Sequence, residues 1–316
     1  MDVQPCLETI VRGRGPDRDL PYALARRVFD AALGGEIADL ELGAMLVAMR
    51  MKGPSADELR AGLDALAPLL RVVPVDPARP VVAIPSYGGA LDTANLVPLL
   101  ACLVAGAGVQ VVIHGVTSDP DCTTTAQVMR AMGLAPVGDL GQAQATIARG
   151  DPAFVPVGTL CPPLEGLLSL RTRLGVRHVG HLLATLLDPT DAARCLRLAC
   201  PPGRREPSLP RGLLERTGRS WLVQDGVDGE AVASAVSGSR IDWVHDGRTE
   251  VLVPRGERVP RDPPVLPEPR DASATARWIQ SVLAGERPVP GTIALQASAV
   301  LHAVGLAPMR RAAVAA

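Results

Sequence analysis

The chain has 316 residues, of which 47% are apolar and 2% aromatic, and its formal net charge is −1. This length allows one large domain or two modest ones, with ample apolar material for a buried core. The near-neutral charge argues against a surface that binds polyanions indiscriminately, but it is compatible with a local basic patch. Lys52 is the single lysine among 32 basic residues, so any such patch is built of arginine.

The first part of the sequence predicts three helices. The first covers 20–33 and is expected to be capped by Asp19, and the second covers 38–52 and ends at Gly53-Pro54. The third begins at Ser55, which together with Glu58 has the spacing of a capping box, and it extends to about residue 70.

From residue 81 onward, apolar strands and helices alternate. Strands are expected at 81–84, 109–113, 220–224 and 249–253, and helices at 92–105, 123–132, 162–174, 178–187, 271–284 and 290–305. Such alternation predicts a parallel sheet covered by helices.

Residues 94–114 are apolar over a length that raises the question of a membrane span. Pro98, Gly106 and Gly108 interrupt this run, which favours a buried helix followed by a buried strand. The N-terminus is polar and has no apolar signal region, so we expect a cytoplasmic protein.

Two segments carry a resemblance to a known family. The stretch Gly35–Asp39, continued by Ala44–Gly53, resembles the helical domain of the anthranilate phosphoribosyltransferases, in glycosyltransferase family 3. Leu170–Arg177 followed by Leu186–Pro189 resembles a second segment of that family. The resemblance implies an α/β fold: a small all-α N-terminal domain and a larger α/β domain with a mostly parallel central sheet, of the nucleoside phosphorylase/phosphoribosyltransferase type. The implied domains are 1–76, with 158–190 packing on it, as a helical and dimerising domain, and 77–157 with 191–316 as the α/β domain.

These enzymes hold a diphosphate and magnesium with a glycine-rich loop, a lysine, hydroxyls and carboxylates. Aligned with the family, this chain has Gly89 in place of the loop aspartate, Val97 and Pro98 in place of two hydroxyl residues, and Ile113 in place of the lysine. Each charge-assisted phosphate contact contributes about 1.5–3 kcal/mol, so we do not expect efficient transfer. We assign no catalytic residue and no metal ligand, and we expect a vestigial ligand cleft at Ser86, Tyr87, Gly88, Gly89, Asn95, His114 and Gly115.

Some side chains have two interpretations. Asp228 and Glu230 lie where the family has its acidic metal pair, and cation binding by them stays open, although no cofactor is expected unless the chain is a magnesium-dependent transferase. His114 either orients a ligand or is a buried, hydrogen-bonded histidine. The cleft residues either admit a small polar ligand or fill the emptied cleft. His178 and His181 are more consistent with structural roles than with a shared metal, because no third ligand lies at a helical spacing.

The segments Ile84–Ala90 and Ala94–Leu100 resemble the YbiB-type branch of the same family. That resemblance implies a homodimer that binds nucleic acid without sequence preference and does not transfer phosphoribosyl groups. The candidate interface residues are arginines, which are expected to contact the phosphate backbone and to depend on salt: Arg194, Arg197, Arg204, Arg205, Arg211, Arg216 and Arg219, with a second group at Arg171, Arg173 and Arg177. The other interpretation of these arginines is a solvated surface.

Three functions therefore stay open. The first is a non-catalytic, YbiB-like homodimer that binds nucleic acid through arginine patches. The second is a glycosyl or phosphoribosyl transferase that uses an unusual donor. The third is a remnant that binds only a partner or a small ligand.

Overall fold

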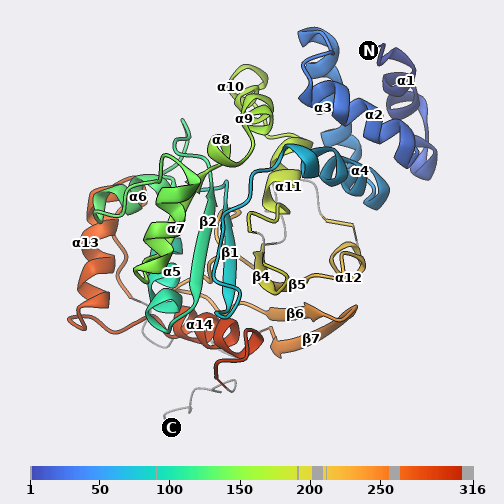
Figure 1. Cartoon of the computed structure of the whole chain (residues 1–316). Coiled ribbons are helices and arrows are strands. Elements are labelled where there is room, and N and C mark those ends of the chain that lie inside the picture. The colour runs from blue at the N-terminus through green and yellow to red at the C-terminus, as the bar shows by residue number, and fades with distance from the viewer. Residues whose placement is uncertain are drawn as a thin grey trace. The chain divides into compact units, whose positions relative to one another are not determined.

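A computed structural model describes residues 2–89, 91–190, 192–200, 209–210, 212–255 and 264–307 (Figure 1). The chain forms two compact units. The first includes Met1–Arg71 and Val157–Leu187, and the second includes Val72–Pro156, with most of the chain after Asp188. We call them the helical unit and the sheet unit.

The helical unit is made of two groups of helices from distant parts of the sequence. They are α1 (Gln4–Arg12), α2 (Tyr22–Leu33), α3 (Asp39–Lys52), α4 (Ala56–Leu66), α8 (Val157–Leu160), α9 (Pro162–Ser169), α10 (Arg171–Leu174) and α11 (Val179–Thr185). Gly62 on α4 permits their close packing, because a Cβ there would lie 2.6 Å from Leu183 and 3.2 Å from Phe29. Two short 3-10 turns, Gly15–Arg18 and Ala67–Leu69, complete this unit.

The helix ends test the predicted caps. Ser55 and Glu58 form the expected capping box at the start of α4. Asp19 does not cap α2, which begins after Pro21 without a side-chain cap. Asp19 instead accepts a 2.6 Å hydrogen bond from Lys52, which also bonds Glu58 at 2.6 Å and is 3% exposed. The buried lysine is therefore paired, as a buried charge must be.

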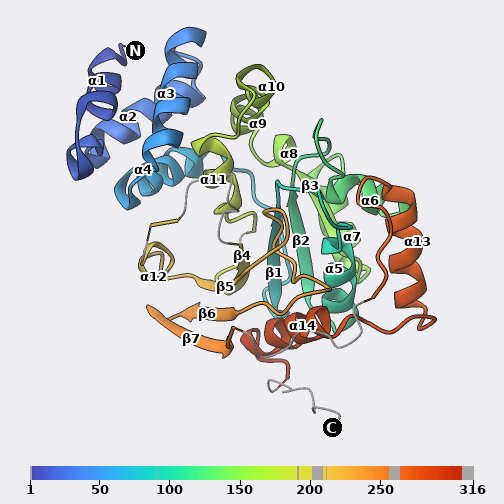
Figure 2. The same ribbon diagram turned by 180° about the vertical axis from the view of Figure 1, so that it is seen from behind.

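The sheet unit contains one seven-stranded sheet. Its strands are β1 (Val81–Ser86), β2 (Gln110–Gly115), β3 (Ala153–Pro156), β4 (Cys195–Ala199), β5 (Ser220–Gln224), β6 (Ile241–His245) and β7 (Arg248–Val253), in the order β3-β2-β1-β4-β5-β6-β7. The first five pair in parallel, and β6 and β7 add an antiparallel hairpin beside β5, visible from both sides in Figures 1 and 2. This mostly parallel sheet confirms the predicted fold class.

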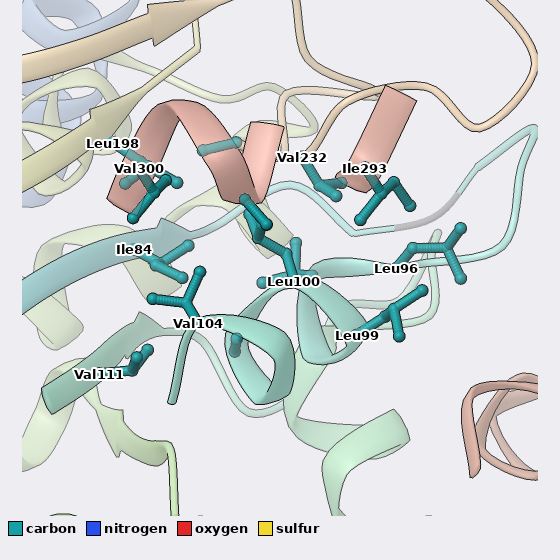
Figure 3. Packing of buried hydrophobic residues seen from close by; sticks show 14 of the residues in the cluster. Ile84, Leu96, Leu99, Leu100, Val104, Val111, Leu198, Val232, Ile293 and Val300 are labelled. Atoms are coloured by element: carbon teal, nitrogen blue, oxygen red, sulfur yellow. The ribbon is translucent and has the colours of Figure 1, made fainter. Parts of the chain in front are cut away.

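Alternate residues of the strands build the main core. Val82 and Ile84 of β1 belong to it, and they pack with residues from the helices that cover this face. Figure 3 shows Ile84, Val104 and Val300 meeting there. The remaining helices of the chain are α5 (Val97–Gly106), α6 (Thr125–Ala131), α7 (Leu140–Ala148), α12 (Leu213–Arg216), α13 (Ala272–Leu283) and α14 (Gly291–Ala303).

The apolar run at 94–114 forms α5 and β2, as predicted, because Pro98 begins the helix and the glycines end it. No helix in the described ranges is long and apolar enough to cross a membrane. The sequence prediction missed helices α1, α7, α8 and α12 and strands β3, β4 and β6.

Candidate functional site

The carboxyl edge of the sheet carries the predicted cleft residues. Ser86 and Gly115 are the last residues of β1 and β2 and are paired in register, and Tyr87 follows directly. The Tyr87 hydroxyl and the His114 Nδ1 share a 3.0 Å hydrogen bond. Burial, and secondarily the charge of Arg197, lower the pKa of His114 to about 3. The imidazole is therefore neutral at physiological pH and offers no positive charge to a phosphate, which is the structural interpretation of His114.

Asn95 is buried and bonded within the chain. Its Nδ2 donates to the Thr123 carbonyl at 3.3 Å and to the Thr125 hydroxyl at 3.0 Å, and its Oδ1 accepts from the Val97 N–H at 3.2 Å. These bonds satisfy the amide inside the protein. Asn95 thus holds the start of α5 through bonds inside the protein.

The glycine loop after β1 is also occupied by groups from the chain itself. The Gly89 N–H donates to a Glu230 carboxylate oxygen at 2.6 Å, and the N–H groups of Leu91 and Asp92 donate to Asp228 at 2.9 and 3.1 Å. The Gly88 carbonyl accepts from the Cys122 thiol at 2.8 Å. Backbone donors that bind phosphate in such loops therefore already bond carboxylates here.

The predicted arginines fall into separate groups. Arg171 and Arg173 lie on α10 of the helical unit and Arg177 follows it, and Arg173 pairs with Asp39 at 2.7 Å. Arg204, Arg205 and Arg211 lie outside the described residues. Arg216 is exposed on α12.

Three of the predicted arginines converge at the amino edge of the sheet. Arg194, Arg197 and Arg219 line a groove of about 1330 Å³ beside the first residues of β1, β4 and β5. Arg79, which the sequence prediction missed, lines the same groove and donates to the Gly108 carbonyl at 3.1 Å. Arg79 precedes the predicted strand at residue 81, and this position could have placed it at the amino edge of the sheet. We call this feature the arginine groove.

The four arginines of the groove differ in how freely they can bind a ligand. Arg197 is 3% exposed and donates to Asp188 and to the Cys195 carbonyl, so it is a structural cation. Arg219 is 49% exposed and shares the same carboxylate of Asp188 at 3.3 Å. Arg194 is exposed and makes no ion pair with any described residue. Arg194 and Arg219 are therefore the charges most available to an anion.

Aromatic rings form another part of the groove wall. Trp243 stacks on His245 with ring centroids 3.8 Å apart, and its indole N–H donates to the Ser220 hydroxyl at 3.0 Å. Asp246 also lines the groove and bonds His245 at 3.2 Å. The groove thus combines arginines with a flat aromatic surface and one carboxylate.

His178 and His181 make structural hydrogen bonds in the helical unit. The ring nitrogens of His178 bond the Gly180 N–H and the Leu167 carbonyl, and His181 Nδ1 accepts from the His178 N–H. Burial lowers the pKa of both, that of His178 to about 4. These histidines are neutral parts of the helix packing.

Comparison with known proteins identifies the class. A model of the glycosyl transferase family, helical bundle domain, matches residues 4–67. The anthranilate phosphoribosyltransferase (TrpD) from Thermus thermophilus has the same fold, with a TM-score of 0.74 and 24% identity, covering 96% of this chain and 90% of that one. The chain belongs to the glycosyl transferase family 3 (TrpD-like) superfamily.

Within this superfamily the chain is similar to YbiB of Escherichia coli. The two are 35% identical over 307 residues, which is 96% of this chain and 95% of YbiB. An anthranilate phosphoribosyltransferase from Methanopyrus kandleri is 28% identical over 289 residues, covering 90% and 84%.

The superfamily fold also raises the question of magnesium. A yeast anthranilate phosphoribosyltransferase in complex with PRPP and Mg shares the fold, with a TM-score of 0.68 and 14% identity over 96% of this chain and 88% of that one. In this chain, the carboxylates of Asp228 and Glu230 bond backbone N–H groups. Among the residues that the structure describes, no three His, Cys, Asp or Glu side chains are placed to hold a metal ion. The residues present do not fit a magnesium-bound diphosphate.

Proposed function

We propose that this chain is a non-catalytic, homodimeric member of the superfamily that binds nucleic acid without sequence preference. The observation that carries the proposal is the arginine groove, where Arg79, Arg194 and Arg219 gather from three distant segments. Its volume of about 1330 Å³ exceeds the ~300–1,000 Å³ of pockets for single small molecules. A long anionic chain suits such a groove better than one small metabolite.

The chemistry of the groove suits phosphates. Arginine binds phosphate oxygens with a planar fork of donors and keeps its charge at every physiological pH. The groove offers few aromatic rings for base stacking, so binding is phosphate-driven and sequence-tolerant. Because counterions are released from the strand, the affinity falls steeply as salt rises.

The carboxyl edge supports the non-catalytic part of the proposal. A transferase with an unusual donor still needs a group to hold the donor's anionic part. The loop N–H groups bond Glu230 and Asp228, and the neighbouring His114 is neutral. These bonds favour the non-catalytic alternative over the transferase.

The surface of α3 supports a homodimer. Leu40 and Met51 on this helix are 83% and 75% exposed, and Ala44 between them is exposed as well. These positions recur at helical spacing, on a different side from the buried Leu42, Met45 and Met49. A helix that is apolar on two sides is expected to be covered on both. We expect a second copy of the chain to cover α3, so that two arginine grooves act together.

The test is the binding of fluorescent single-stranded and double-stranded oligonucleotides at 50–200 mM salt. Replacing Arg194 and Arg219 together with alanine should weaken binding roughly tenfold or more and make the logarithmic salt slope shallower by about 1.4 for a single strand, about 0.7 for each lost phosphate contact. The double variant Arg130→Ala with Arg149→Ala removes the same charge from exposed positions outside the groove and should bind like the wild type.

Three results would contradict parts of this proposal. If the wild type does not bind at 50 mM salt, the chain is not a nucleic-acid-binding protein. Binding that both double variants weaken equally would mean that the groove is not the interface. Sedimentation of the same samples tests the dimer, since Leu40→Asp with Met51→Asp should give monomers, and a wild-type monomer contradicts the homodimer.

A further inference from the structure

The carboxyl edge holds two carboxylates against the loop that follows β1. Glu230 accepts the Gly89 N–H at 2.6 Å, and Asp228 accepts the N–H groups of Leu91 and Asp92 at 2.9 and 3.1 Å. The partners are separated by 136 to 141 residues in sequence. Three backbone donors of one loop therefore converge on two acidic side chains of a single turn.

That turn, residues 227–230, is built to present both carboxylates. The backbone N–H groups of Val227 and Glu230 each donate to the other's carbonyl, at 3.2 and 2.8 Å. Asp228 has φ +54° and Gly229 has φ +84°. The left-handed conformation is unfavourable for most residues with a side chain but is tolerated by aspartate, so the turn keeps an acidic residue in a position where glycine is usual.

The turn packs directly on the loop. A Cβ at Gly88 would lie 2.6 Å from the Asp228 carbonyl oxygen and 3.0 Å from the Glu230 carboxylate. Glu230 is 2% exposed. At Gly88 the loop and the turn are therefore too close to admit another group while both carboxylates stay in place.

Converging backbone N–H groups form a site for anions, and a carboxylate is an anion. Bonds from N–H groups to a charged acceptor are stronger than those between neutral groups. We propose that Asp228 and Glu230 are a built-in anion, which occupies the loop donors in place of a phosphate ligand, keeps the loop folded without a ligand and excludes a diphosphate. This closure is independent of nucleic-acid binding, since the arginine groove lies at the opposite edge of the sheet.

Inorganic pyrophosphate is the probe, and thermal unfolding of the full chain is the measurement. The test is made in the Arg194→Ala with Arg219→Ala background, which keeps pyrophosphate from binding the arginine groove. With the turn intact, this chain should show no pyrophosphate-dependent rise in Tm. Adding Asp228→Gly with Glu230→Ala leaves three backbone donors without acceptors, and glycine adopts the left-handed conformation at position 228 without strain, so the Tm should fall by roughly 5 °C or more. Pyrophosphate should then recover part of this loss in a saturable manner, because it can reach the emptied donors.

Asp225→Ala is the matched control. Asp225 precedes the same turn but is exposed and pairs with Arg255 at 2.8 Å. It should change neither the Tm in buffer nor the response to pyrophosphate. Asp228→Gly alone, in the same background, carries the test if the double variant does not fold, because Asp228 is only half-buried and Glu230 then stays in place.

The proposal is overturned if pyrophosphate stabilises the Arg194→Ala with Arg219→Ala chain while Asp228 and Glu230 are intact, which would show that the loop donors are accessible. It is also overturned if the Asp228 and Glu230 variants are as stable as that chain, or if they lose stability and pyrophosphate restores none of it. Loss of oligonucleotide binding by Arg194→Ala with Arg219→Ala bears on the proposed function and leaves this result unaffected.

Discussion

The two edges of the sheet differ in what their polar groups bond. At the carboxyl edge, the loop N–H groups, Asn95, Tyr87 and His114 all bond groups of the chain itself. At the amino edge, Arg194 and Arg219 border an open groove. Ligands of open α/β sheets usually bind at the carboxyl ends of the strands. In this chain the polar groups of that edge bond one another, and the opposite edge offers exposed positive charge.

The superfamily fold is kept in this chain, while the polar groups of the carboxyl edge bond one another. At the carboxyl edge, which we call the closed edge, hydrogen bonds within the chain stabilise groups that could otherwise bond a ligand. At the amino edge, which we call the open edge, arginine side chains stay at the surface because burying a charge loses its solvation. Changes at the closed edge should therefore act on stability, and changes at the open edge on binding.

The largest effect is expected for Gly115→Ala at the closed edge. The added Cβ would overlap the backbone carbonyl oxygen of Ser86 on the neighbouring strand, which cannot move without separating β1 from β2. A loss of more than ~4 kcal/mol is expected, of the size that only severe steric conflicts or buried charges produce. The urea midpoint from circular dichroism measures it.

Gly106→Ala is the control for that change. A Cβ at Gly106, the last residue of α5, would meet no atom within 4 Å. It should leave stability unchanged or raise it by about 0.5–1 kcal/mol, since alanine favours the helix more than glycine does. Equal urea midpoints for the two variants would show that the strands do not approach as closely as described.

The next effect is expected for Asp188→Ala, beside the arginine groove. The change leaves the buried guanidinium of Arg197 without its carboxylate, which is expected to cost about 3–5 kcal/mol. Asp225→Ala removes an exposed pair with Arg255 and should stay within about 1 kcal/mol. If Asp188→Ala has the same urea midpoint as the wild type, the pair between Asp188 and Arg197 does not stabilise β4.

The smallest effect, a pH dependence, comes from His114. Burial lowers its pKa from 6.5 to about 3 in the folded protein, so below pH 6.5 the unfolded chain binds a proton that the folded chain does not. Stability should therefore fall as pH decreases through this window, by up to about 1.4 kcal/mol per pH unit from this residue. The arginines of the open edge contribute no such slope, because they stay charged.

Urea unfolding at pH 7, 6 and 5 checks this contribution. His114→Gln should reduce the slope of stability against pH. Tyr87→Phe removes the hydroxyl bonded to His114 but leaves the burial that is the main cause of the shift, so it should lower stability and keep the slope. An unchanged slope in His114→Gln would mean that the pKa of His114 is the same in the folded and the unfolded protein.

Local sequence patterns predicted much of the fold but not all of it. The capping box at Ser55 and the glycine after α3 marked real helix ends, because those contacts join residues three or four apart. Strand β4 was missed because Arg197 interrupts its apolar pattern. A buried arginine in a strand needs a carboxylate beside it. Asp188 supplies that carboxylate from outside β4, so the residues of the strand alone do not reveal the pair.

The family and the alternation of strands and helices could be predicted from the sequence alone, since they follow from residue types and short spacings. The bonds of Asp228 and Glu230 to the loop, and the placing of Arg79 beside Arg194 and Arg219, depend on the folded structure. The physical reason is strand order. The sheet places β1 beside β4 and then β5, so residues more than 100 positions apart become neighbours at its two edges.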